Sequence, residues 1–273
     1  MISLMLAGAM MNQSLSGQDP NSGKGLEQGP DPKIGRKILW ADEFAKEGRP
    51  DPSKWNYEVG KVRNGEAQYY TKDRSRNSRV QGGRLVIEAH KEAFEGAAIT
   101  SASLESKAAW SGVYVEVKAK IPTGRGTWPA IWMLGDAIRQ KGDKFIDWPS
   151  CGEIDILENV GFDPERIHFN IHCEAYNHMK GNGKGASIVV PKAWEDFHVY
   201  GMDMKKDRLD FYFDGKRVFT YAKESDDRKV WPYGEPHYLI LNLAIGGSWG
   251  GAQGIDDAIF PSVYTIDYVR VYK

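Results

Sequence analysis

The feature that most restricts the fold is a strict alternation over residues 113–121, VYVEVKAKI. All odd-numbered positions are apolar, and Tyr, Glu and Lys stand between them. Because successive side chains of a β-strand point to opposite faces, this period of two predicts a strand with one buried face. No long helical pattern competes with it elsewhere in the sequence.

Further strand-like runs follow at short spacing, separated by glycine-bearing turns. They lie at residues 84–89, 209–213, 217–221, 237–244 and 265–272. Asp214 and Gly215, between the second and third runs, are typical of a tight hairpin turn. At most one helical turn, at residues 192–196, interrupts the pattern. Many short strands without βαβ alternation predict an all-β fold, an antiparallel sandwich or barrel, forming one domain over residues 34–273.

Composition narrows the classes of partner. The chain has 36 basic and 37 acidic residues and a formal net charge of -1, so a nucleic-acid or membrane partner is not expected. Nine Trp and thirteen Tyr indicate either large β-sheet cores or a surface that stacks on flat apolar ligands such as sugars.

The first 33 residues differ from the rest of the chain. Residues 2–11 are mainly apolar and include small residues, but no basic residue precedes them. We interpret this run as an atypical or truncated export signal, with a disordered start as the alternative. It is too short to span a bilayer. Residues 12–33 are rich in Gly, Pro, Asp, Ser and Gln, as in a flexible leader.

The sequence holds two cysteines, Cys151 and Cys173. They allow one disulfide bond without implying it. No CxxC or HExxH spacing occurs, so a catalytic metal is not expected.

Three acids are interleaved with apolar residues in the octapeptide GEIDILEN. In a regular strand, Glu153 and Asp155 would share one face, while Glu158 would point to the opposite, apolar side. One extra residue near Ile156 and Leu157, a β-bulge, would return Glu158 to the face of the other two acids. The pattern therefore predicts a bulged strand with three carboxylates on one face.

Such a face suits the hydrolysis of glycosides. A strand rise of about 3.3 Å per residue places the two outer Cα atoms roughly 13 Å apart, and their side chains can lean together. Retaining glycosidases use two carboxyl groups about 5–5.5 Å apart. Repulsion separates their pKa values into one ionised nucleophile and one protonated acid, and Asp155 can share a proton with the nucleophile. The alternative is a solvated acidic strand or a calcium site.

The hexapeptide EIDILE matches the bulged ExDxxE signature of glycoside hydrolase family 16, whose unbulged ExDxE form belongs to bacterial lichenases. Five further blocks resemble the laminarinase branch of this family: NGEAQYY at 64–70, GTWPAIWMLG at 126–135, WPSCG at 148–152, LNLAIGGSW at 241–249 and DYVRVY at 267–272. The resemblance runs from about Trp40 to Tyr272. It implies a β-jelly roll of two curved sheets with an open cleft on the concave side.

The resemblance also implies a role for each acid. Glu153 would be the nucleophile, Asp155 its helper and Glu158 the general acid/base. The reaction would be the retaining endo-hydrolysis of β-1,3 linkages in a β-glucan such as laminarin, through a covalent glycosyl-enzyme. Catalysis would require no cofactor.

Residues in and near the matching blocks are candidates for binding sugar. Trp128, Trp148 and Trp249 would stack on glucose rings, with core packing as the alternative. His172 would border the acid/base and orient it or bond a sugar hydroxyl, unless it is a satisfied core histidine. Asn64 would bond a hydroxyl away from the cleavage point, unless it only caps a turn.

The family resemblance further implies a structural calcium on the convex side. By position, Glu43, Gly83 and Asp267 would supply its oxygen ligands. The polymeric substrate and the N-terminal run imply a secreted or periplasmic protein, and we expect a monomer.

Two departures from the laminarinase pattern bear on specificity. Residues 60–64, GKVRN, lack the Trp that many laminarinases carry before Asn-Gly-Glu, and residues 173–185 form an insertion-like loop close to the cleft. The substrate therefore stays open between β-1,3-glucan, mixed-linkage β-1,3-1,4-glucan and a galactan of the agar or carrageenan kind. A non-catalytic carbohydrate-binding jelly roll is the alternative from another class, although binding alone needs no repelling carboxylates.

Overall fold

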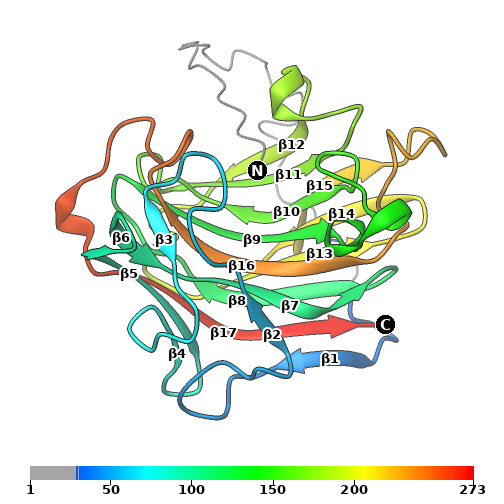
Figure 1. The fold of residues 1–273 in the computed structure, drawn as a ribbon. Coiled ribbons are helices and arrows are strands. Elements are labelled where there is room, and N and C mark those ends of the chain that lie inside the picture. Colours follow the sequence, from blue (N-terminus) through cyan, green and yellow to red (C-terminus); the bar gives the residue numbers. More distant parts are fainter. Residues whose placement is uncertain (1–28, 30) are drawn as a thin grey trace.

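The computed structural model describes residue 29 and residues 31–273. Nearly all of the predicted export signal and leader, residues 1–33, lies outside the described residues. The rest of the chain forms two β-sheets packed face to face, as predicted (Figure 1). Every strand pair is antiparallel except β3 with β6.

The larger sheet has ten strands, and its main path runs β15-β14-β13-β8-β17-β5-β6-β3, with β1 paired to β17 and β4 to β5. Its strands are β1 (Ile38–Asp42), β3 (Gln68–Tyr70), β4 (Ser78–Val80), β5 (Leu85–Phe94), β6 (Ala97–Ser101), β8 (Tyr114–Lys120), β13 (His198–Met204), β14 (Arg208–Phe213), β15 (Lys216–Ala222) and β17 (Ser262–Tyr272). The predicted hairpin joins β14 to β15, where Asp214 and Gly215 both have positive φ, as a type I′ turn requires.

The smaller sheet has seven strands in the order β12-β11-β10-β9-β16-β7-β2. They are β2 (Trp55–Tyr57), β7 (Ser103–Trp110), β9 (Thr127–Gly135), β10 (Glu153–Glu158), β11 (Arg166–His172), β12 (Lys184–Val189) and β16 (His237–Ile245). The strand that carries the three acids, β10, therefore lies between β9 and β11 (Figure 1).

Helix is confined to four short 3-10 segments among the described residues: η1 (Asp136–Arg139), η2 (Gly142–Lys144), η3 (His178–Lys180) and η4 (Asp257–Ile259). Residues 192–196 form turns and bends instead of a helical turn. No helix in the described part of the chain has the length and hydropathy needed to cross a membrane.

The core lies between the two sheets. Val115, Val117 and Ala119 of β8 are fully buried there, opposite side chains such as Ile154 of β10. Burying these aliphatic side chains stabilises the sandwich by about 1.5–3 kcal/mol for each Val or Ile. The alternation in residues 113–121 thus identifies the core face correctly.

The opposite face of β8 is less polar than its sequence suggests. Glu116 is only 1% exposed. The hydroxyls of Tyr114, Tyr268 and Tyr272 each donate to its carboxylate over 3.2 Å, and Lys33 lies 3.4 Å away. The segment that precedes β1 therefore covers part of this face, which a pattern of period two cannot indicate.

Candidate active site

The bulge in β10 is present where the sequence predicts it. The register of β10 with β11 shifts between Asp155 and Glu158, and its register with β9 shifts between Asp155 and Leu157. Ile154, Ile156 and Leu157 are all fully buried in the core between the sheets. The extra residue lets both Ile156 and Leu157 face inward, so all three acids lie on the outer face of the sheet.

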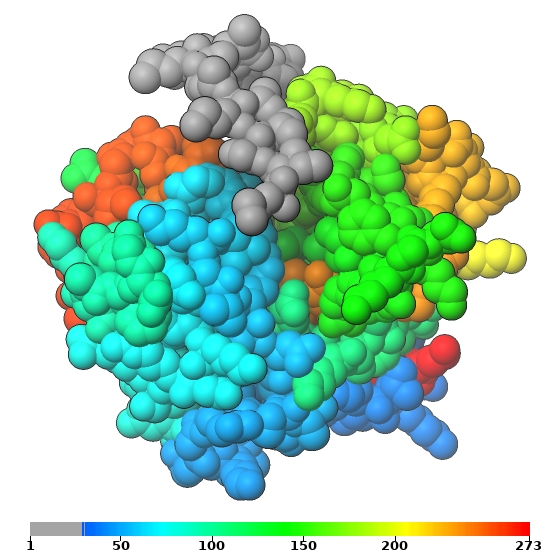
Figure 2. All heavy atoms as spheres, viewed as in Figure 1, coloured from blue at the N-terminus to red at the C-terminus, as the bar shows by residue number. Residues whose placement is uncertain are grey.

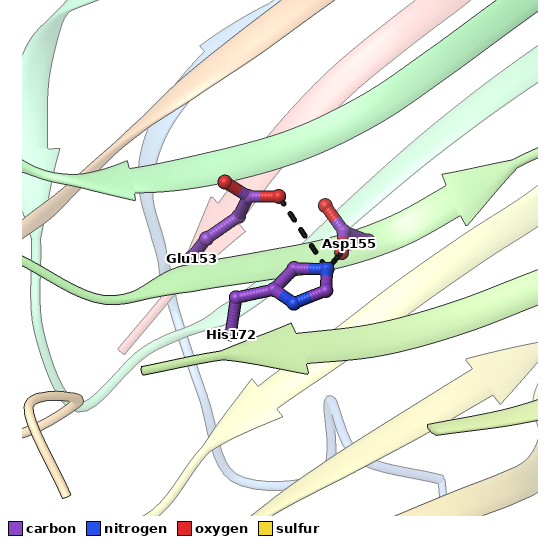
Figure 3. Close-up of side chains that lie close together, drawn as sticks. All are labelled: Glu153, Asp155 and His172. Carbon is purple, nitrogen blue, oxygen red and sulfur yellow. Dashed lines mark ion pairs between the residues drawn. The ribbon is translucent and has the colours of Figure 1, made fainter. Parts of the chain in front are cut away.

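The Glu153 end of β10 is a cluster of acids, imidazole and indole. The Trp148 indole N–H donates to Glu153 Oε2 over 2.7 Å. Figure 3 shows Nε2 of His172 facing both carboxylates, 3.7 Å from Glu153 Oε1 and 3.4 Å from Asp155 Oδ2. His178 packs its ring against those of Trp148 and His172, with centroids 5.3 and 5.2 Å apart.

Asp155 is the buried member of this cluster, at 2% exposure. Burial, the charge of Glu153 and a hydrogen bond shared with the Glu153 carboxyl raise the pKa of Asp155 well above its ordinary value. The direction of this shift favours the protonated form of Asp155, which can donate a hydrogen bond to Glu153. This arrangement suits Glu153 for the role of nucleophile.

The Glu158 end is held by two neutral donors. The Trp128 indole N–H donates to Glu158 Oε1 over 3.1 Å, and the Asn170 amide donates to Oε2 over 3.0 Å. Burial, followed by the charges of Asp155 and Glu153, raises the pKa of Glu158 to about 8. At neutral pH most of this group is protonated, which is the form that a general acid needs.

His172 contacts the acids at the Glu153 end of the site. The sequence predicted that it borders the acid/base; it is the register partner of Glu153, contacts Glu153 and Asp155, and also lowers the pKa of Glu158. Asn170, two residues earlier on the same strand face, contacts Glu158 instead. The alternation of residues 168, 170 and 172 could have identified Asn170, since all three share one face of β11.

The two tryptophans near Glu158 pack against each other. Trp128 is 9% exposed and meets Trp249 edge to face, with ring centroids 5.6 Å apart. Trp249 is half-buried and packs against the His168 ring at 4.8 Å. Trp128 therefore presents its N–H to Glu158 more than an open ring face, whereas Trp249 and the half-buried Trp148 keep exposed surface.

Asn64 occupies a turn. Its φ is 56°, its amide donates to Glu66 Oε1 over 3.3 Å, and its carbonyl accepts from the Ser248 N–H over 2.9 Å. The capped turn named as an alternative is thus present, and it ties residue 64 to the GGSW block beside Trp249. The side chain stays exposed.

Arg63 fills the place of the missing tryptophan. Its guanidinium lies 4.8 Å above the ring of Trp132 and forms an ion pair with Glu58. Trp132 is the register partner of Asp155, so both side chains point to the outer face of the sheet. Sequence alone does not indicate this role of Arg63, because Trp132 lies far along the chain.

A hollow marks this face of the molecule. In Figure 2 it separates the segment near residue 60, in light blue, from the segment near residue 140, in green. Trp132, with Arg63 above it, belongs to the same outer face of the sheet as the acids. The loop after β11 brings η3 and His178 against the Glu153 end of the site.

The residues predicted to hold calcium are engaged in other contacts. Both oxygens of the Glu43 carboxylate accept from Arg270, over 2.8 and 2.9 Å. Asp267 lies 2.9 Å from Lys118 and 3.5 Å from Arg84. Cationic side chains thus pair with both carboxylates, and calcium binding at this site stays a prediction.

Another set of side chains has the spacing of metal ligands. Ligand atoms of Glu153, Asp155 and His172 lie within 4.8 Å of one another (Figure 3). Cys151 and Cys173 are both buried free thiols, so the optional disulfide does not form.

Comparisons with known proteins agree with this geometry. The family model described as glycosyl hydrolases family 16 matches residues 64–270. A β-glucanase of Rhodothermus marinus is 45% identical over 246 residues, which cover 87% of this chain and 85% of that protein.

Solved structures show the same fold. The laminarinase from Rhodothermus marinus has a TM-score of 0.83 at 44% identity, covering 87% of this chain and 97% of that chain. A non-specific endo-β-1,3(4)-glucanase of family 16 has a TM-score of 0.83 at 42% identity, covering 91% and 95%. The predicted jelly roll is confirmed, and the chain belongs to glycoside hydrolase family 16.

Proposed function

We propose that this protein is a retaining endo-glycosidase that hydrolyses β-1,3 linkages in β-glucans such as laminarin. The observation that carries the proposal is the contrast along β10. Glu153 lies beside Asp155, whose pKa is raised by burial, while the raised pKa of Glu158 keeps that group protonated at neutral pH. One strand therefore presents a nucleophile and a general acid on the same face.

In the first step, Glu158 gives its proton to the oxygen of the scissile bond. The Glu153 carboxylate attacks the anomeric carbon at the same time, and a covalent glycosyl-enzyme forms as the leaving chain departs. Donors that face the acids prepare this step: Trp148 fixes Glu153, and Trp128 and Asn170 fix Glu158. Asp155 keeps its proton near Glu153.

In the second step, Glu158 is a carboxylate and takes a proton from water. The resulting hydroxide attacks the anomeric carbon and releases Glu153. Two inversions at one carbon give net retention of configuration. His172, which faces Glu153 and Asp155, is placed to bond a hydroxyl of the sugar bound there.

Trp128, Trp148, Trp249 and Asn64 complete the proposed sugar-binding set. Trp148 and Trp249 offer indole surface to sugar rings, Trp128 lines the wall beside Glu158, and Asn64 offers its exposed amide. The substrate that these contacts favour is a neutral chain, because the cationic group over Trp132 is paired with Glu58.

The test is product analysis of the purified protein on laminarin, barley mixed-linkage glucan and agarose, with Glu158→Gln as the control. Oligosaccharides from laminarin that disappear in the variant support the β-1,3 assignment. Products from mixed-linkage glucan or agarose alone would identify a different substrate for the same family mechanism. No products from any of them, with binding to laminarin retained, would favour the carbohydrate-binding jelly roll.

Secretion and a monomeric state belong to the same proposal. A polymer of glucose is degraded outside the cell that uses it, and periplasmic or extracellular fractionation of the native protein tests the location.

Catalysis in this family needs no cofactor. Calcium binding at Glu43, Gly83 and Asp267 stays a prediction, in which backbone oxygens would be the ligands. Equal melting temperatures with calcium and with a chelator would contradict it.

A further inference from the structure

We propose that Asn170 is a positioning residue for Glu158: its amide N–H fixes the orientation of the carboxyl group and stabilises the carboxylate that remains after proton donation. The inference rests on the proposed hydrolase function and adds to it a residue outside the acid triplet. It begins from the hydrogen bond between Asn170 Nδ2 and Glu158 Oε2, 3.0 Å long.

Glu158 is held from the two neighbouring strands. Trp128 of β9 donates to Oε1, and Asn170 of β11 donates to Oε2. Each oxygen thus has one neutral donor, and the plane of the carboxyl group is set by two contacts from opposite sides. Two hydrogen bonds from rigid strands restrict the side chain more than either bond alone, as a proton donor requires.

The space for the Asn170 amide is provided by a glycine. Gly185 of β12 is the register partner of Asn170. A Cβ at residue 185 would lie 2.2 Å from Asn170 Oδ1 and 2.5 Å from the Phe169 carbonyl oxygen. Glycine therefore lets Oδ1 lie against β12 while the NH₂ group faces Glu158, whose carboxylate can only accept.

The charges around Glu158 explain why a neutral donor is useful there. Burial raises its pKa, and Asp155 and Glu153 on the same strand add to the rise. From β11, His172 opposes the rise, and His168 is neutral because burial lowers its pKa to about 4. From β9, only the Trp128 N–H acts on it. The Asn170 amide stabilises the carboxylate form of Glu158 by a hydrogen bond. It adds no positive charge, which would keep Glu158 ionised throughout the catalytic cycle.

The experiment compares the wild-type protein with Asn170→Ala and with the nearly isosteric Asn170→Asp. The measurement is the pH profile of kcat/KM on laminari-oligosaccharides and on an aryl β-laminaribioside with a dinitrophenyl leaving group. Because kcat/KM reports the first chemical step, a leaving group that needs no proton bypasses Glu158.

For Asn170→Ala we expect kcat/KM on oligosaccharides at neutral pH to fall by about 10- to 100-fold, the scale of a hydrogen bond to a charged group. The alkaline limb of the pH profile should move to higher pH. For the dinitrophenyl glycoside, kcat/KM should fall by less than about threefold, which is less than the effect of a hydrogen bond to a charged group. Asn170→Asp should move the limb further, because a carboxylate beside Glu158 opposes its ionisation.

Gly185→Ala provides an independent variant that leaves Asn170 in the chain. It should shift the limb in the same direction, because the new methyl group displaces the amide. Ser187→Ala, on the same strand at the register partner of His168, is the matched control and should leave both substrates unchanged.

Equal losses on both substrates, with an unmoved pH profile, would overturn the proposal and leave Asn170 as a residue that only supports the strand. Failure of the proposed function is a separate outcome, in which the wild-type protein cleaves neither substrate. The pKa of Glu158, read by carboxyl NMR against Glu158→Gln, then tests the inference directly: it must rise in Asn170→Ala, and an unchanged value would contradict it.

Discussion

The two ends of β10 carry the same functional group in different surroundings. At the Glu153 end, the carboxylate faces Asp155, whose pKa is raised, together with His172 and the Trp148 N–H. At the Glu158 end, two neutral donors contact the carboxyl group, and burial and the nearby acids raise its pKa to about 8. We infer that neighbours, more than residue type, divide the proposed roles of nucleophile and acid between the two glutamates.

Removing the nucleophile should have the largest effect. In Glu153→Gln the amide cannot attack the anomeric carbon, so kcat should fall by on the order of 10⁶-fold, the scale seen when a nucleophile is removed. The loss should be the same for laminarin and for an aryl glycoside with a good leaving group. The exposed Glu195, which pairs with Lys192, supplies the matched control Glu195→Gln. Equal activity of the two variants would assign the nucleophile elsewhere.

Changing the other end should give a loss that depends on the leaving group. Glu158→Gln cannot donate a proton, and kcat/KM on laminarin should fall by about 10²- to 10⁴-fold. Hydrolysis of a dinitrophenyl glycoside, whose leaving group departs without a proton, should keep most of its kcat/KM. A uniform loss on both substrates would erase the distinction between the two ends.

Asp155→Asn tests the protonation state of the helper. A neutral amide replaces a buried acid and can still donate to Glu153, so we expect a loss of kcat of only about tenfold, which corresponds to one pKa unit. The folded-state pKa of Asp155 is raised, so the wild-type protein binds this proton more tightly when folded and loses stability as pH rises above the ordinary pKa.

Melting temperatures at several pH values measure this pH dependence of stability. The advantage of Asp155→Asn over the wild type should grow between pH 4 and pH 8. Glu158→Gln should behave alike, with the gain levelling off above about pH 8, where Glu158 is ionised in both the folded and unfolded protein. A stability difference that does not change with pH would mean that neither acid holds its proton in the folded state.

The smallest effect is expected at Trp148. Trp148→Phe keeps an aromatic ring against His178 but removes the N–H that donates to Glu153. We expect kcat/KM on laminarin to fall by about tenfold, the lower end for a hydrogen bond to a charged group. Trp148→Ala should lose more, through the missing ring. If the Phe variant matched the wild type, the indole N–H would not help to fix the nucleophile.

Local sequence was sufficient for the parts of the molecule that depend on alternation. The pattern of Ile154, Ile156 and Leu157 against the acids predicted the bulge, because hydrophobic burial allows only one way to place all three. The same physics located the strands and the hairpin at Asp214. These features are set by neighbours within a few residues.

The alternation of apolar and polar residues could not predict contacts between distant segments of the chain. The guanidinium of Arg63 covers Trp132, and Lys33 helps to bury Glu116. The sequence around Arg63 and Lys33 contains no pattern that predicts either contact. The register of β10 with β11 also pairs His172 with Glu153, and the Asn170 amide reaches Glu158. Pairing between strands decides such contacts, and it requires the folded register.

The most direct test of the account is the anomeric form of the first product. Laminarin is hydrolysed in an NMR tube, and the new reducing ends are read before mutarotation equilibrates them. The two-step mechanism predicts that the β-anomer appears first and the α-anomer grows in later, because Glu153 and Glu158 act in two successive displacements. Initial release of the α-anomer would mean a single displacement by water and would contradict the role assigned to Glu153.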